Sequence, residues 1–148
     1  MGSTTVTSTF ELSVSSDMNN LVVIADFVTT VAEKLGLDEQ ETFALQMAVD
    51  EASSNVMEHA YRGHSDGRLS LRVQALDDEV VVTICDQGER FDPQSVPRPD
   101  ISAPLQERHN GGLGLYLMEK LMDSVAWEFD PERGNTLTMR KRCGTPAV

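Results

Sequence analysis

The chain is poor in positive charge, in cysteine and in long apolar runs. Its 148 residues contain 12 Lys and Arg against 24 Asp and Glu, which gives a net charge of −12 at pH 7. This balance argues against a nucleic-acid binder, which needs cations to displace the counterions of the phosphates. It equally argues against a polybasic membrane anchor. Two cysteines, Cys85 and Cys143, are too few for a disulfide framework and indicate a reducing compartment.

The sequence also predicts neither a membrane-spanning segment nor a secretory signal. The longest apolar run, Leu21 to Ala25, is far shorter than the ~20 residues that a spanning helix needs. The first twenty residues contain no Lys or Arg, so we expect no signal peptide and a cytoplasmic location. The hydrophobic fraction of 40% is enough for one core, and the length predicts a single domain over residues 1–148.

The acidic residues are concentrated in the first part of the chain. Residues 1–58 contain ten acidic residues and one basic residue, Lys34, and so carry −9 of the net −12. One interpretation is a solvated helix face, which is the usual reason for such a pattern. The other is an acidic docking surface for a basic partner. The sequence leaves both open.

Hydrophobic periodicity predicts the order of helices and strands. Alternation over residues 6–14 indicates a strand, and apolar residues spaced by three and four over 21–35 indicate a helix that Gly36 ends. Asp38 and Glu41 form a capping-box variant that opens a second helix through Ala60. Further elements are expected as strands at 69–75, 80–85, 125–129 and 137–139 and as a helix at 113–122.

This order favours one fold class over another. Strands and helices do not alternate regularly, as they would in a doubly wound fold. We therefore predict an α/β two-layer sandwich, with a mixed, mostly antiparallel sheet and helices on one face. Residues 92–110 lose all periodicity and contain four of the six prolines, and such a stretch is usually functional or mobile. The tail at 144–148 is expected to be loose.

Three short motifs carry the chemistry. In the first, Glu51, Asn55 and His59 are four residues apart and share one helical face. An acid and an amide flanked by small residues can hold a hydrated Mg²⁺ together with a water or hydroxyl group. In the second, Asp86-Gln87-Gly88 follows a buried strand. Its carboxylate can accept a hydrogen bond from an exocyclic amine, and its glycine lets a flat ring approach the backbone.

The third motif is a glycine cluster that opens a helix, Asn110-Gly111-Gly112-Leu113-Gly114-Leu115. Glycines before a helix N-terminus let backbone N–H groups converge on an anion, and the helix dipole adds to that attraction. No Gly-Lys-Ser/Thr follows, so the cluster is not a Walker P-loop. A long loop precedes it in place of a strand, so it is not a dinucleotide fingerprint either.

Together the three motifs resemble the N, G1 and G2 boxes of the GHKL ATPases, which have the Bergerat fold. Gly134-Asn135-Thr136 resembles the small final box of that family, and the resemblance spans residues 8–142. The run from Ala48 to Asn55 and the segment Glu58-His59-Ala60-Tyr61 look most like the anti-sigma-factor serine kinases of the RsbW and SpoIIAB type.

The resemblance implies a role for each matched residue. Glu51 would be the general base toward a serine hydroxyl or water, and Asn55 would bind Mg²⁺. Asp86 would recognise the adenine amine with Gly88 beneath the ring, and Thr136 would support the adenine end. Residues 92–110 would be the ATP lid. The remaining ATP-binding residues would be His59, Arg90, Asn110, Gly111, Gly112, Leu113, Gly114 and Leu115.

The implied function is that of a Mg-ATP-dependent protein serine kinase. It would act as an anti-sigma factor in a partner-switching circuit and phosphorylate a STAS-type antagonist. An alternative is an ATP-gated binding module that sequesters a regulatory partner without significant phosphotransfer. The chain departs from the family pattern in two places. Glu89-Arg90 replaces a second glycine, and no Lys or Arg occurs before Lys34, where members that bind sigma factors have basic residues.

A homodimer is the last expectation. The first strand begins the chain and is expected at a sheet edge, where unpaired backbone groups invite pairing. Val6, Phe10 and Leu12 give that strand an apolar face, and Glu11 is the only charged residue between Met1 and Ser16. The related switch kinases are dimers, which favours the same assembly here.

Overall fold

The computed structural model describes residues 5–90, 92 and 110–144. Its main elements are β1 (Ser8–Ser15), α1 (Leu21–Leu35), α2 (Glu39–Asn55), β2 (Arg68–Ala75), β3 (Glu79–Asp86), α3 (Asn110–Leu121), β4 (Ser124–Asp130) and β5 (Gly134–Arg142). A short 3₁₀ turn, Met18–Asn20, precedes α1, and a π-helical turn, Val56–Ala60, follows α2. The expected lid and loose tail fall almost entirely outside the described residues.

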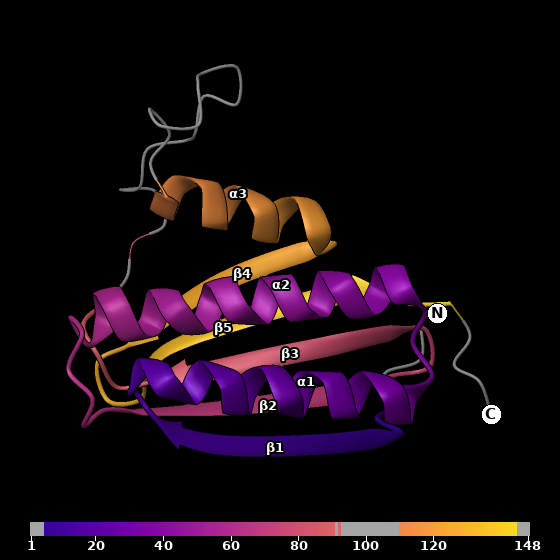
Figure 1. The fold of residues 1–148 in the computed structure, drawn as a ribbon, viewed down its shortest axis with the longest axis horizontal. Helices are drawn as coiled ribbons and strands as arrows, with labels where there is room; N and C mark the ends of the chain where they lie inside the picture. The colour runs from indigo at the N-terminus through magenta and orange to yellow at the C-terminus, as the bar shows by residue number, and fades with distance from the viewer. Residues whose placement is uncertain (1–4, 91, 93–109, 145–148) are drawn as a thin grey trace.

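The strands form one antiparallel sheet. Their order across the described sheet is β1-β2-β3-β5-β4, and every neighbouring pair is antiparallel. The three α-helices cover one face of this sheet, so the predicted two-layer α/β architecture is confirmed (Figure 1). β3 is central, as its continuous apolar run indicates, and β1 lies at an edge, as expected.

Local chemistry sets the turn between α1 and α2. Gly36 ends α1 in the left-handed conformation with φ 69°, and its N–H donates to the carbonyls of Ala32 and Glu33. Asp38 then caps α2 by accepting from the N–H of Glu41 at 2.7 Å, and the Glu41 carboxylate accepts from the N–H of Asp38 at 2.9 Å. The predicted capping box is therefore confirmed in full.

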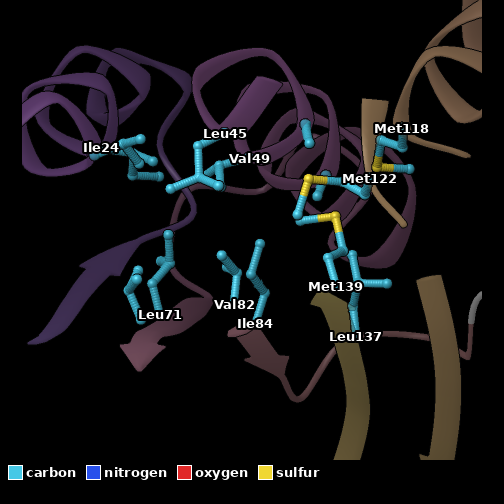
Figure 2. Packing of buried hydrophobic residues seen from close by; sticks show 14 of the residues in the cluster. Ile24, Leu45, Val49, Leu71, Val82, Ile84, Met118, Met122, Leu137 and Met139 are labelled. Carbon is cyan, nitrogen blue, oxygen red and sulfur yellow. The ribbon is translucent and has the colours of Figure 1, made fainter. Parts of the chain in front are cut away.

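The core lies between the helices and the sheet (Figure 2). Helix side chains point down and strand side chains point up into one cluster, and each labelled residue is at most 4% exposed. The labelled members are Ile24, Leu45, Val49, Leu71, Val82, Ile84, Met118, Met122, Leu137 and Met139. None of the described helices has both the length and the apolar character needed to cross a membrane.

Candidate active site

The end of α2 widens into a π-helical turn at the site. The N–H of Tyr61 donates to the carbonyl of Val56 at 3.0 Å, five residues back instead of four. Such turns inside helices occur frequently at functional sites. Glu51 is half-buried and Asn55 is buried, whereas His59 is exposed. His59 is thus the exposed member of the three, and it lies within this π-helical turn.

Asp86 lies at the end of β3 and is only 4% exposed. Its Oδ1 accepts two hydrogen bonds, from the backbone N–H of Gly88 at 2.9 Å and from Asn135 Nδ2 at 2.8 Å. Burial raises the pKa of this carboxyl group, while the bonds from Asn135 and Gly88 act in the opposite direction. In the described residues both hydrogen bonds go to Oδ1, so Oδ2 is available to a donor from a ligand.

A small pocket opens beside the Asp86 carboxylate. The side chains around it come from the end of α2 and from β3, β4 and β5, and they are mostly apolar, as small-molecule pockets usually are. Its lining residues are Asn55, Val56, Ala60, Asp86, Trp127, Asn135 and Leu137. Asn55 Nδ2 is buried and has no hydrogen-bond partner within the described part of the chain. A buried donor without a partner is rare in proteins, so Asn55 Nδ2 is a candidate for contact with a bound group.

The loop after Asp86 is fixed to the end of α2 by three contacts. The N–H of Glu89 donates to Ala60 O at 2.8 Å, and the N–H of Gln87 donates to the Tyr61 hydroxyl at 2.8 Å. An exposed ion pair joins Arg62 Nε to Glu89 Oε2 at 2.8 Å. A Cβ at Gly88 would lie 2.5 Å from Ala60 O, so the backbone at Ala60 already requires a glycine here. This steric reason is separate from the expected approach of an adenine ring.

Glu51 meets the start of α3. A Cβ built at Gly114 would collide with Glu51 Oε2, so only a glycine lets the carboxylate lie this close to the helix. The pKa of Glu51 is raised, first by burial and then by the negative charges of Asp50 and Glu58. A carboxylate with a raised pKa is a better proton acceptor, which suits it to a general base.

The described residues contain no group of three or more His, Cys, Asp and Glu side chains that could hold a metal ion. This does not conflict with Mg²⁺, because that ion commonly takes only one or two protein oxygens and completes its shell with phosphates and water. The buried amide of Asn55, which lies one helical turn from Glu51, fits such a ligand.

Two predicted site residues do not line the Asp86 pocket. Thr136 is on the opposite face of the sheet, where its Oγ1 lies 3.9 Å from Cys85 Sγ. The guanidinium carbon of Arg90 lies 5.5 Å from the ring centroid of Phe129, which is a cation–π contact with β4. Thr136 is therefore turned away from the Asp86 pocket, whereas Arg90 lies over Phe129, which is opposite Asn135 in the β4–β5 register. The side chains of Asn110 to Leu113 lie outside the described part, and Leu115 is buried in the core.

Sequence reasoning missed two residues of the pocket, Asn135 and Trp127. Asn135 lies directly opposite Asp86 in the β3–β5 register, and successive residues of a strand face opposite sides. That parity would have placed Asn135 with Asp86, and Thr136 with Cys85. Trp127 is half-buried, packs against the core and also lines the pocket.

Comparison with known proteins gives consistent results. Residues 14–141 match the family described as the histidine kinase-like ATPase domain. The serine-protein kinase RsbW of Bacillus subtilis is 33% identical over 135 residues, which cover 88% of this chain and 83% of that protein. The serine-protein kinase RsbW of Bacillus licheniformis is 36% identical over 118 residues, which cover 75% and 71%.

Solved structures show the same fold. The structure of the RsbU and RsbW domains of Rv1364c from Mycobacterium tuberculosis superposes with a TM-score of 0.69 at 17% identity. That match covers 95% of this chain and 34% of the other, so this chain spans about a third of it. The catalytic domain of the histidine kinase ThkA gives a TM-score of 0.52 at 14% identity, over 95% and 99% of the two chains.

Proposed function

Because the chain belongs to the histidine kinase-like ATPase domain family, in its RsbW group of serine-protein kinases, we propose that it transfers phosphate from Mg-ATP to a serine of a partner protein. The partner is a STAS-type antagonist in a cytoplasmic circuit that regulates transcription, with the chain acting as an anti-sigma factor. One observation carries the proposal. A buried acceptor (Asp86) and an orphaned amide (Asn55) line one pocket, and one helical turn before Asn55 a carboxylate of raised pKa (Glu51) contacts α3 at Gly114.

Recognition of the base rests on Asp86. The exocyclic amine of adenine is a donor, and an ionised carboxylate can only accept hydrogen bonds, whereas a protonated carboxyl group can also donate one. The N–H of Gly88 and the amide of Asn135 both donate to Oδ1 and favour the ionised form. GTP presents a carbonyl oxygen at the same ring position, which would face the carboxylate as a second acceptor. We therefore expect the pocket to select adenine.

Binding of the phosphates rests on Asn55 and on the start of α3. The first N–H groups of an α-helix have no partner within the helix, and the helix dipole adds positive potential at that end. Those of α3, which begins at Asn110, suit an anion. Asn55 would supply an oxygen to Mg²⁺, and the bound ion would neutralise charge on the transferring phosphoryl group.

Phosphotransfer rests on Glu51. The Glu51 carboxylate accepts the proton of the serine hydroxyl as that oxygen bonds to the γ-phosphorus. The bond from phosphorus to the bridging oxygen breaks at the same time, and ADP leaves. Deprotonation by a positioned carboxylate is typically worth about 10²–10⁴-fold in rate. The contact between Glu51 and Gly114 supports this role, because a nucleotide whose phosphates bind at the start of α3 would have its γ-phosphate near this base.

The test is phosphotransfer from γ-labelled ATP to candidate STAS-type antagonists encoded in the same genome. We expect label on one serine of one antagonist, in the presence of Mg²⁺ and not with EDTA. Label transfer with Glu51→Gln at the wild-type rate would refute Glu51 as the base. ATP binding without transfer to any antagonist would favour an ATP-gated binding module. Failure to bind ATP would refute the proposal as a whole.

A further inference from the structure

We infer that Asn135 is a positioning residue that sets the base selectivity of the pocket by holding the Asp86 carboxylate and the loop after it as one unit. The inference rests on the proposed function, because it concerns the nucleotide that the pocket takes. It assigns a role to a residue of the final box for which the sequence motifs implied none, since they implied a role only for its neighbour Thr136.

Asn135 is placed by the turn that opens β5. Gly134 has φ +87°, which is strained for any residue with a side chain, and a Cβ there would collide with Asp86 O. The two strands therefore approach closely at this end, and the register sets Asn135 opposite Asp86. The Asn135 side chain is only 7% exposed, so few alternative positions are open to it.

The amide of Asn135 serves two different groups at once. Its Nδ2 lies 2.8 Å from Asp86 Oδ1 and 2.9 Å from Glu89 O, with Gly88 O at the longer distance of 3.4 Å. An amide NH₂ has two hydrogens, so it can donate to the carboxylate and to a backbone carbonyl together. A serine or threonine hydroxyl has only one hydrogen and could serve only one of them. An aspartate at this position would have no hydrogen to donate in its ionised form.

This arrangement determines what the carboxylate offers a ligand. With Oδ1 bound by Gly88 and Asn135, the plane of the carboxylate is fixed, and Oδ2 is left to the pocket. Burial raises the pKa of Asp86 and so opposes its ionised form. The hydrogen bonds from Asn135 and Gly88 lower this pKa, and the bond from Asn135 has the larger effect of the two. Without Asn135, a larger fraction of Asp86 would carry a proton. A protonated carboxyl group can donate to the carbonyl oxygen of guanine or hypoxanthine, so selectivity for adenine would narrow.

The contact with Glu89 extends the same unit toward α2. The carbonyl of Glu89 accepts from Asn135, while its N–H donates to Ala60 O at 2.8 Å. The loop after Asp86 is thus bound on one side by Asn135 of β5 and on the other side by Ala60, after the end of α2. A purely structural role would be limited to this tethering, and it would change the stability of the fold without changing the preference among bases.

The test compares dissociation constants of ATP, GTP and ITP, each with Mg²⁺, by calorimetry on the full chain. For Asn135→Ala we expect ATP to bind about tenfold more weakly, as for loss of a hydrogen bond to a charged group. We also expect the preference for ATP, measured as the Kd of GTP or ITP divided by the Kd of ATP, to fall by a similar factor. Asn135→Ser keeps one donor for Asp86, so it should retain the selectivity and lose less affinity. The matched control is Thr138→Ala, on the same strand but the opposite face, which should change neither.

Thermal unfolding without nucleotide is recorded for every variant. If Asn135→Ala does not fold, the isosteric Asn135→Asp carries the same test. Two neighbouring carboxyl groups would then share a proton, so selectivity should narrow and depend on pH. Wild-type ratios in a folded Asn135→Ala would overturn the inference, as would a loss of selectivity in Thr136→Ala instead. If the wild-type protein binds no ATP, the proposed function itself is refuted. If the wild type binds ATP and an Asn135 variant keeps the same preference for ATP, only this inference is refuted.

Discussion

Glu51 and Asp86 are two acidic side chains whose pKa values are raised for the same first reason, burial, but whose neighbours differ. Asp86 receives two hydrogen bonds on Oδ1, which fix its direction and favour its charge. Glu51 instead faces the negative charges of Asp50 and Glu58, which favour its protonated form. Different environments thus suit one carboxylate to recognition and the other to proton transfer.

Removal of the Glu51 carboxylate should separate binding from catalysis. We expect Glu51→Gln to bind Mg-ATP as the wild type does and to lose about 10²–10⁴-fold in phosphotransfer rate. A base acts only when deprotonated, so the wild-type rate should rise with pH through the raised pKa of Glu51. Initial rates measured across pH, beside calorimetry for ATP, check both statements.

The exposed neighbour Glu58 offers a matched control for that pH profile. Its charge raises the pKa of Glu51, so Glu58→Gln should move the acidic limb of the profile to lower pH. The plateau rate should change little, because Glu58 itself is exposed. An unshifted acidic limb would mean that another group limits the rate.

Asp86→Asn should weaken ATP binding without weakening the fold. Loss of a charged acceptor typically removes about 1.5–3 kcal/mol of binding free energy. The folded-state pKa of Asp86 is raised, so its contribution to stability is present below the ordinary pKa and is lost as pH rises through the folded value. At neutral pH the neutral amide should therefore leave the nucleotide-free protein at least as stable as the wild type.

Thermal unfolding with and without Mg-ATP measures both parts of this prediction. We expect an equal or higher Tm without nucleotide and a smaller rise in Tm on addition of ATP. A lower nucleotide-free Tm would show that the carboxylate is needed for the fold itself.

At the scale of elements, the sequence predicted what local chemistry determines. The capping box at Asp38, the glycine stop at Gly36 and the alternation of β2 all act over a few residues, and each appears where expected. The π-helical turn Val56–Ala60 was not predicted, because a stretch of five residues is too short for its hydrophobic pattern to distinguish it from a continuing α-helix.

The final box shows a second limit of sequence reasoning. The motif Gly134-Asn135-Thr136 could not tell which of two adjacent residues faces the helices. A shift of one residue in strand register exchanges the two faces of a sheet, and the turn that sets the register is a tertiary feature. No motif indicates the close approach of Gly134 to Asp86 O. This approach sets the register in which Asn135, and not Thr136, faces the helices.

The contact between α2 and α3 gives a prediction at this scale. A methyl group at Gly114 would collide with Glu51 Oε2, the end of a flexible side chain, so Gly114→Ala should displace Glu51 and leave the fold largely intact. Alanine is also the better helix former by about 1 kcal/mol. We expect a loss of phosphotransfer much larger than any change in Tm.

Urea unfolding and phosphotransfer, measured on the same preparation, test this contact. The control is Gly144→Ala, because a Cβ at Gly144 has no atom within 4 Å. This substitution should change neither the stability nor the phosphotransfer rate. Wild-type activity in Gly114→Ala would place the Glu51 carboxylate away from α3 during the reaction.

For the molecule as a whole, charge and sheet edges govern association. Most of the acidic residues that give residues 1–58 a charge of −9 are exposed, among them Asp26, Glu33 and Asp50. Exposed acids fit the interpretation of a solvated surface and leave open a basic partner. Meanwhile β1 is an edge strand, and its apolar residues Phe10 and Leu12 pack against the core. The apolar face that we expected to support dimerisation is thus turned inward. Only the backbone N–H and C=O groups along the β1 edge are then left to pair with a second copy.

We expect a homodimer that pairs through the β1 edge and strengthens as salt rises. Unpaired N–H and C=O groups of an edge strand invite pairing with a second copy. Two acidic surfaces repel each other, but exposed charges farther apart than about 10 Å are screened at 0.1 M salt. Thr9→Glu adds a charge to this exposed edge and should weaken the dimer, whereas Ser124→Glu makes the same change on the opposite edge strand and should not. Light scattering that gives the 16.3 kDa monomer mass for the wild type at high protein and salt concentrations would rule the dimer out.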